Sequence, residues 1–303
     1  MNIAFFGTSD IGIETLKSIN EHFSVKAVIT TKDKKGKRNK ILIESPIKKQ
    51  AIKLGLDFFQ PEKLDDNFLS QIKDCQMGVL FSYGKIIPQN VIDAFKYGIL
   101  NIHPSILPKY RGASPIISAL LNGDLYTGIS IIKLTKDLDA GDCLMQKIIE
   151  ITPDDNNITL SNKISYLASQ MIICAIEFYK DGLLKPKPQK GNISYTKKFN
   201  KNDTLINFEN DDACFAVRKV KAFAGYLDAF FYYNSKIYKI LKASVCDLSA
   251  TPATIVKVSK NSLIVACKNK SISIEQIKPE GKNAMSIEAF LAGHKFQCGQ
   301  KII

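Results

Sequence analysis

Of the 303 residues, 45% are hydrophobic, and 42 Lys and Arg against 29 Asp and Glu give a formal net charge of +13. No apolar run reaches the roughly 18 to 20 residues of a membrane span, so the chain is expected to form a globular protein without a membrane anchor, long enough for two domains. Seven scattered cysteines without a Cys-x-x-Cys pair, and only three histidines, argue against a disulfide framework and against a bound metal.

The positive charge has two interpretations. It suggests a polyanionic partner such as a nucleic acid. Alternatively, lysine is simply common throughout a chain rich in Lys, Ile and Asn. The net charge does not distinguish these interpretations. The positions of the charged residues along the chain have to be considered.

The first half of the chain alternates between apolar runs and amphipathic segments. Residues 3–6 predict a first strand rather than a signal peptide, which gives a cytoplasmic location as the expectation. Gly12, Leu16, Ile19 and Phe23 then share one helical face. Further apolar runs predict strands at 25–30, 77–81 and 127–134. The alternation indicates an open α/β sheet whose site lies at the carboxyl ends of the strands.

Two helix boundaries are marked by their residues. Ser45-Pro46 is typical of a helix start, and Gly55 ends that helix. Ser114-Pro115 likewise predicts a helix that runs to Asn122-Gly123. A long helical pattern from Ile164 to Phe178 is expected to pack across the sheet.

Residues 32–40 form a basic run in which six of the nine residues are Lys or Arg. A run of this kind is often only a solvated loop. It can also supply cations for phosphate groups, which add affinity without reading a sequence.

Polar groups, prolines and a glycine converge in residues 101–115, directly after an apolar run. Asn101 and His103 are two apart on an extended segment and therefore point the same way. An amide donor beside an imidazole suits stabilisation of an oxyanion or movement of a proton. From these two residues alone, a structural histidine and a turn asparagine are the better explanation.

The last third of the chain differs in composition and in its pattern of apolar residues. Residues 185–204 are rich in Pro and Lys and predict a basic linker. Short alternating runs follow at 230–233, 236–241, 253–258, 262–267 and 271–277, and they predict a small β-barrel. The predicted domains are therefore 1–184, the linker 185–204, and 205–303.

Two sequence motifs resemble a known family. Asn-x-His-Pro-Ser-x-Leu-Pro from Asn101 to Pro108, followed by Tyr-Arg-Gly-Ala-x-Pro from Tyr110 to Pro115, resembles the signature of the folate-dependent formyltransferases, and in particular of those that act on tRNA. Leu138-Asp139-Ala140-Gly141-Asp142 resembles a downstream element of the same family.

This resemblance implies an α/β, Rossmann-like open-sheet formyltransferase domain followed by a small C-terminal, OB-like β-barrel. The implied reaction transfers formyl from 10-formyltetrahydrofolate to the α-amino group of methionyl initiator tRNA. Asn101, His103 and Asp139 would be catalytic. A nearby carboxylate is expected to favour the imidazolium form of His103. The protein is expected to act as a monomer.

The resemblance also assigns binding residues. Folate is expected to contact Ser82, Tyr83, Gly84, Ser105, Ile106, Leu107, Pro108 and Asp137. The tRNA is expected to contact Lys35, Lys37, Arg38, Lys40, Arg111 and Lys198.

The chain departs from the family pattern at two places. Asp137 stands where glycine is more usual, so that the sequence offers two carboxylates, Asp137 and Asp139, on one face. Residues 224–227 replace the usual Asn-Pro-Trp-Pro. Alternatives are formylation of an amino sugar nucleotide or of a phosphoribosyl glycinamide, hydrolysis of formyl-folate, and a non-catalytic RNA-binding role.

Overall fold

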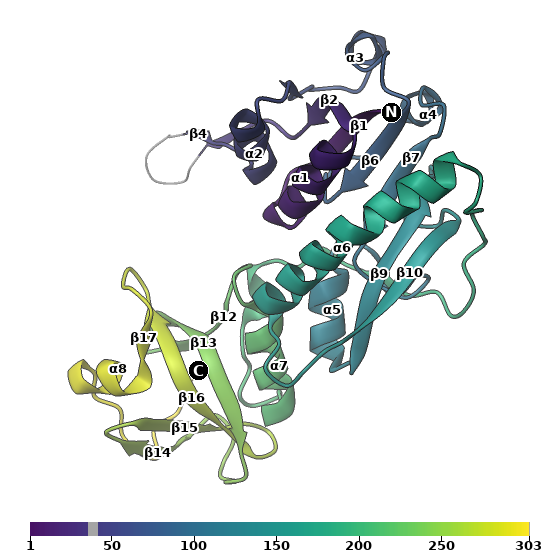
Figure 1. Ribbon diagram of the computed structural model, residues 1–303. Helices are drawn as coiled ribbons and strands as arrows, with labels where there is room; N and C mark the ends of the chain where they lie inside the picture. The colour runs from purple at the N-terminus through teal and green to yellow at the C-terminus, as the bar shows by residue number, and fades with distance from the viewer. Residues whose placement is uncertain (36–41, 303) are drawn as a thin grey trace. The chain divides into compact units, whose positions relative to one another are not determined.

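The computed structural model describes residues 1–35 and 42–302 (Figure 1). The chain forms two compact units. The first comprises Met1–Pro115, Tyr126–Glu150 and Ser161–Lys197, and the second comprises Ile116–Leu125, Ile151–Leu160 and Lys198–Ile303. None of the helices in the described part of the chain combines the length and the apolar character that crossing a membrane requires.

The first unit is built on a seven-stranded sheet with the order β10-β9-β7-β6-β1-β2-β5. Its strands are β1 (Asn2–Gly7), β2 (Ser24–Ile29), β5 (Phe58–Phe59), β6 (Met77–Phe81), β7 (Ile99–His103), β9 (Tyr126–Lys133) and β10 (Cys143–Glu150). The pairs from β5 to β7 are parallel, whereas β9 and β10 join in antiparallel orientation. The Rossmann-like sheet predicted from the sequence is confirmed.

Helices cover both faces of this sheet. They are η1 (Asp10–Gly12), α1 (Ile13–His22), α2 (Pro46–Leu54), α3 (Asp66–Gln71), α4 (Gln89–Asp93) and the part of α6 (Asn157–Lys180) from residue 161 onward. Phe6 packs edge-to-face with Phe68 of α3 and lies in one cluster with Val91 of α4. On the opposite face, the side chains of Phe5 and Ile47 lie close to each other beside Gly12. Burial on both faces explains why these strands are continuous apolar runs.

The local signals for α2 were correct. The hydroxyl oxygen of Ser45 accepts a hydrogen bond from the Lys48 amide (3.0 Å), and Pro46 occupies the first turn. Gly55 closes the helix with φ +67°, a left-handed conformation that favours glycine. The sequence did not predict β10, because Gln146, Lys147 and Glu150 give this edge strand an exposed, polar character.

The carboxyl ends of β1, β6 and β7 meet at one edge of the sheet. There the Thr8 amide donates to the Ser82 carbonyl (3.0 Å), and the Thr8 hydroxyl donates to the Tyr83 carbonyl (2.8 Å). The chain order reverses between β1 and β6, and such a switch point is where open α/β sheets place their ligands.

Residues 185–204 do not form a separate linker. The part up to Lys197 packs with the first unit, in which β11 (Tyr195–Thr196) pairs with β8 (Arg111–Gly112). The remainder, from Lys198, packs with the second unit. Proline and lysine content gave the expectation of a linker, but pairing with residues 84 positions earlier in the chain cannot be inferred from local composition. A second short pair, β3 (Lys34–Lys35) with β4 (Leu42–Ile43), flanks residues 36–41.

The second unit contains an antiparallel sheet with the order β12-β13-β16-β15-β14, with β17 paired to β16. Its elements are part of α5 (Pro115–Asn122), η2 (Lys201–Thr204), α7 (Ala213–Phe223), β12 (Ala229–Tyr233), β13 (Lys236–Cys246), β14 (Ile255–Ser259), β15 (Ser262–Ala266), β16 (Ser271–Pro279), β17 (Met285–Ser286) and α8 (Ile287–Gly293). All five strands expected from the alternating pattern are present. Among the described residues, no strand pairing joins β12 to β14, so the sheet is antiparallel without such a closure of the barrel.

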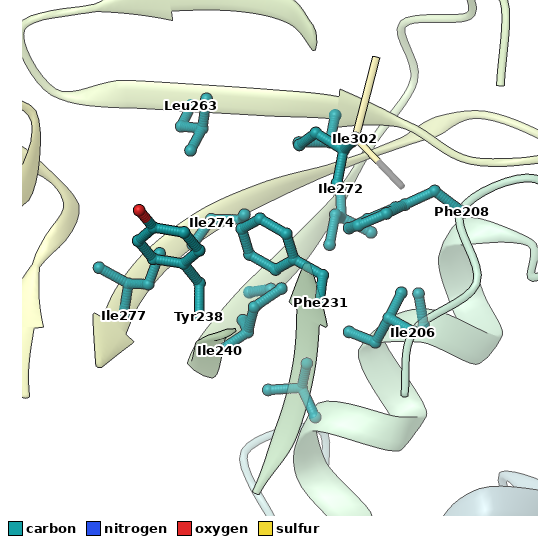
Figure 2. Packing of buried hydrophobic residues seen from close by; sticks show 14 of the residues in the cluster. Ile206, Phe208, Phe231, Tyr238, Ile240, Leu263, Ile272, Ile274, Ile277 and Ile302 are labelled. Atoms are coloured by element: carbon teal, nitrogen blue, oxygen red, sulfur yellow. The ribbon is translucent and has the colours of Figure 1, made fainter. Parts of the chain in front are cut away.

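Aromatic and branched side chains fill the core of the second unit (Figure 2). Phe231 stacks on Tyr238, with ring centroids 5.5 Å apart, and meets Phe208 edge-to-face at 5.7 Å. The isoleucines of β16, including Ile272 and Ile274, complete this cluster. The alternation of buried and exposed side chains along the strands is therefore a product of this single packed face.

Candidate active site

Strand β7 brings Asn101 and His103 side by side at the edge of the sheet. Every residue of β7 is buried, and both polar residues are only 4% exposed. Leu80 pairs with Asn101 on one side of β7, and His103 pairs with Ser130 of β9 on the other. Two polar groups held this deep in a sheet need partners, because an unpaired buried polar group costs about 1 to 3 kcal/mol.

The partner is the carboxylate of Asp139, in the turn between β9 and β10. The Asn101 Nδ2 donates to Asp139 Oδ1 (3.1 Å), and His103 Nδ1 lies 3.4 Å from Asp139 Oδ2. The Gly112 amide also donates to Asp139 Oδ2 (2.8 Å). The catalytic trio expected from the sequence therefore lies together. Asp137, the competing carboxylate, is exposed.

The backbone of the Asp139 turn is tightly constrained. Asp139 has φ +47°, a left-handed conformation that costs a non-glycine residue of order 1 to 3 kcal/mol unless its surroundings hold it. A Cβ at Gly141 would lie 1.8 Å from the Lys133 carbonyl oxygen, so this position requires glycine. In this conformation the Asp139 carboxylate is directed toward β7.

His103 is held by a hydrogen bond through one ring nitrogen, and its other ring nitrogen faces Asp139. Its Nε2 donates to the Tyr110 carbonyl (2.9 Å), because a carbonyl oxygen can only accept. In the neutral ring, Nδ1 therefore faces the Asp139 carboxylate without a proton. Burial lowers the pKa of His103, and this effect outweighs the opposing effects of the Asp139 carboxylate and the Tyr110 carbonyl. The expected imidazolium is thus disfavoured, because spacing along the chain reveals the carboxylate but not the burial.

This arrangement can accept a proton. A proton that arrives between His103 Nδ1 and Asp139 Oδ2 would give both ring nitrogens of His103 a hydrogen-bond partner. At the same time, Asn101 uses one amide hydrogen on Asp139 and has a second one to offer. The site therefore combines a proton acceptor with a neutral hydrogen-bond donor on the same carboxylate.

Residues 104–110 form a loop in which many hydrogen-bonding groups already have partners within the protein. The hydroxyl of Ser105, which is fully buried, donates to the Lys109 carbonyl (2.6 Å). The Leu107 amide donates to the Ser130 hydroxyl (3.0 Å), and the Leu107 carbonyl accepts from Gln146 (2.9 Å). Ile106 is partly exposed, and Pro108 is buried. The predicted folate contacts of this loop stay predictions, and among its predicted contact residues Ile106 has the more exposed side chain.

In the loop after β6, the side chain of Tyr83 is buried, whereas its neighbours Ser82 and Gly84 are exposed. Tyr83 packs its ring against Phe6 in the core, and burial raises its pKa to about 12. Ser82 and Gly84 are exposed, and no atom lies within 4 Å of where a Cβ of Gly84 would be. This backbone therefore has open space beside it that a ligand can enter.

The residues expected to contact tRNA are dispersed. Lys37, Arg38 and Lys40 lie outside the described residues, and Lys35 ends β3 beside them. Lys198 is exposed in the second unit. Arg111 is only 9% exposed, and its guanidinium donates to Gln189 Oε1 (3.2 and 2.7 Å). Contact of these residues with tRNA stays a prediction.

Sequence reasoning missed residues 187–196, which border the site. Gln189 donates to the carbonyls of Asp139 and Gly141 (2.8 Å each), and Ser194 donates from its amide to the Pro108 carbonyl (3.2 Å). An uncharged glutamine among lysines and prolines is a weak signal, and nothing local connects it with Asp139.

Other chemistries find little support here. Burial raises the pKa of the Cys143 thiol to about 11, so that it is protonated at neutral pH and is a poor nucleophile. Within residues 1–35 and 42–302, no group of three His, Cys, Asp or Glu side chains is arranged to hold a metal ion.

Comparisons with known proteins agree with the sequence motifs. Residues 1–176 match the family described as formyl transferase, and residues 198–295 match the formyl transferase C-terminal domain. The chain is 38% identical over 301 residues to a methionyl-tRNA formyltransferase of Thermodesulfovibrio yellowstonii, which covers 98% of this chain and 97% of the relative.

Two solved structures share the fold. HypX from Aquifex aeolicus, in complex with tetrahydrofolic acid, has a TM-score of 0.66 at 15% identity, covering 97% of this chain and 47% of that one. An N-formyltransferase from Helicobacter canadensis, in complex with folinic acid and dTDP-3-aminofucose, has a TM-score of 0.68 at 18% identity, covering 90% and 98%. At these identities the likeness concerns the fold.

The lowered pKa of His103 predicts how stability depends on pH. Below the unfolded pKa of about 6.5, the unfolded chain binds a proton that the folded His103 refuses, so stability falls as the pH falls. Between about pH 7.5 and 5.5, we expect the wild type to lose about 1 kcal/mol more unfolding free energy than His103→Asn. Urea denaturation at each pH measures this difference.

The matched control is His22→Asn, since His22 is exposed in the same unit. It should keep the pH dependence of the wild type. An equal loss of stability in His103→Asn and the wild type would contradict the assignment of a buried, neutral His103.

Proposed function

The chain belongs to the formyltransferase family, and we propose that it transfers the formyl group of 10-formyltetrahydrofolate to the α-amino group of methionyl-tRNA. The observation that carries the reaction class is the meeting of Asn101, His103 and Asp139 around one carboxylate. The identity of 38% over nearly the whole length to a relative of that name supports the tRNA as acceptor. Because the proposed substrate is an aminoacyl-tRNA, we also propose a cytoplasmic location.

The folate would supply a formyl group activated by its attachment to N10. Ser82 and Gly84 leave exposed backbone and open space at the end of β6, which suits a flat heterocycle that hydrogen-bonds to main-chain groups. The backbone of residues 106–108 faces the same edge, since it follows β7. Tyr83 would contribute only its main chain, because its ring is in the core.

Removal of the amine proton is the first task of the site. The α-amino group has a pKa of about 8, so that the neutral nucleophile costs only about 1 kcal/mol near neutral pH. The side chain of Asp139 is 12% exposed and that of His103 is 5% exposed, so the carboxylate is the part of the pair nearer to solvent. We assign Asp139 as the group that receives the proton, with His103 Nδ1 sharing it. The proton would pass on to N10 when the bond between the formyl carbon and N10 breaks and tetrahydrofolate leaves.

Stabilisation of the formyl oxygen is the second and larger task. Negative charge develops on this oxygen during attack, and removing one preorganised donor from such a site typically costs about 3 to 4 kcal/mol. Asn101 has a free amide hydrogen and is fixed by Asp139, so we assign it as the main donor. His103 would help through its effect on Asp139, because its own Nε2 proton is held by Tyr110.

Recognition of the tRNA would use charge outside this site. The net charge of +13 suits a polyanion. The basic residues Lys35, Lys37, Arg38 and Lys40 are proposed to bind phosphates near the acceptor end, with Lys198 contributing from the second unit. We also propose that the initiator tRNA is the acceptor used.

An acceptor comparison tests the function. With labelled 10-formyltetrahydrofolate, we expect formylated product from methionyl initiator tRNA and none from free methionine or an amino sugar nucleotide. Product formed only from the sugar nucleotide would replace the tRNA as acceptor. Formate released without any acceptor would indicate hydrolysis.

Replacing Asn101 tests the assigned donor. In Asn101→Ala, kcat should fall about 100- to 1000-fold, because one oxyanion donor is lost. The affinity for methionyl-tRNA, measured by filter binding, should stay within about twofold of the wild type. Asn67→Ala, an exposed asparagine of α3, is the matched control. A loss of tRNA affinity that parallels the loss of turnover would contradict the catalytic role.

Neutralising the basic run tests the tRNA contact. The triple variant Lys37→Gln, Arg38→Gln, Lys40→Gln should bind tRNA more weakly, and the slope of log affinity against log salt should become shallower by about 2 to 3. The control triple variant, Lys53→Gln, Lys73→Gln, Lys96→Gln, makes the same charge change at exposed positions of the same unit. Equal slopes in the two variants would exclude a specific phosphate contact by the basic run.

A further inference from the structure

We propose that Gln189 is a positioning residue of this site: its side-chain amide connects Arg111 to the turn of Asp139 and thereby sets where the Asp139 carboxylate stands. The inference rests on the proposed function for its kinetic consequence. Its structural part concerns only the first unit, which contains all three residues.

The amide of Gln189 uses its hydrogen-bonding capacity on both sides. Its Nε2 donates to the carbonyls of Asp139 and Gly141, at 2.8 Å each. Its Oε1 accepts from Arg111 Nε and Nη2, at 3.2 and 2.7 Å. One group thus joins a buried guanidinium to the two carbonyls that flank the middle of the turn.

The chemistry of an amide fits this place and that of other side chains does not. Two carbonyl oxygens need a donor with two hydrogens, and the guanidinium needs an acceptor. A glutamate would serve Arg111 but would place oxygen against the carbonyls of Asp139 and Gly141. A methionine of similar length would serve neither side.

The turn needs this support. Asp139 has φ +47°, and at Gly141 a Cβ would collide with the Lys133 carbonyl, so the turn is closely confined. The main chain of Asp139 is bound by Gln189 while its carboxylate accepts from Gly112 and Asn101. A shift of the main chain would therefore move the carboxylate relative to β7.

Gln189 is itself fixed, because the segment that carries it is anchored on both sides. Lys187 exchanges two main-chain hydrogen bonds with Cys143 (2.7 and 2.9 Å). Further along, the Ser194 hydroxyl accepts from the Tyr110 amide (2.9 Å), and Tyr195 pairs with Arg111. Residues 187–196 thus bind both the turn of Asp139 and the loop after His103.

The test compares Gln189→Met and Gln189→Glu with the control Gln71→Met, an exposed glutamine of α3. We expect kcat for formyl transfer to fall about 10- to 100-fold in both Gln189 variants, because the Asp139 carboxylate is displaced. The KM values for the folate and for methionyl-tRNA should stay within about twofold, since the lost interaction acts on the reacting groups. Thermal unfolding checks that each variant is folded.

A second measurement does not depend on activity. With ¹⁵N-glycine labelling, NMR follows the exchange of the Gly112 amide, which donates to Asp139 Oδ2, and of the Gly98 amide, which donates to the Phe95 carbonyl. In both Gln189 variants we expect faster exchange at Gly112 and unchanged exchange at Gly98.

The outcomes separate the two proposals. Wild-type kcat, or wild-type exchange at Gly112, in Gln189→Met would overturn the positioning role. A wild-type protein that forms no formylated tRNA, with faster exchange at Gly112 in the variants, would overturn the proposed function and support the role of Gln189 in the turn.

Discussion

The site depends on a single carboxylate that two donors share and that a third side chain faces. Asp139 accepts from Asn101 and from the Gly112 amide, and it faces His103 Nδ1. Hydrogen bonds to a charged group contribute about 1.5 to 3 kcal/mol each, so the carboxylate can hold the end of β7, the loop around Gly112 and its own turn in one register. The same negative charge that organises these segments is what makes the pair a proton acceptor. The Asp139 carboxylate therefore both holds these segments together and takes part in the proposed proton transfer.

Sequence patterns predicted the elements better than the contacts between them. The apolar run ending at His103 and the prolines after it placed Asn101 and His103 correctly at the end of a strand. Spacing alone did not separate Asp137 from Asp139, because an extended segment would present both on one face, and only the Leu-Asp-x-Gly-Asp match favoured Asp139. The turn is not extended: with φ +47°, Asp139 faces β7 while Asp137 is exposed. Backbone conformation of this kind depends on packing against Lys133 and Gln189, which local spacing does not encode.

Long-range pairing explains the remaining differences between the sequence-based predictions and the structure. Residues 187–196 have the composition of a linker, yet they pair with residues near Arg111 and bind the turn of Asp139. The C-terminal strands, by contrast, were recognisable because one face of their sheet packs on a shared core around Phe231, and this leaves a period of two in the sequence. The burial of His103, like the pairing of residues 187–196, depends on long-range contacts. It reverses the expected protonation state, although its charged neighbour was foreseen.

The placement of charge separates recognition from chemistry. The residues proposed to react are buried, and the guanidinium of Arg111 beside them is engaged by Gln189 rather than directed outward. The excess of positive charge instead lies in lysines distributed over the chain, including the basic run of residues 32–40. Attraction of a polyanion is screened by salt and tolerates loose geometry, whereas proton transfer requires groups held within hydrogen-bonding distance. A buried trio beside a lysine-rich surface therefore allows the affinity for a large anionic acceptor to change without disturbing the pKa of His103.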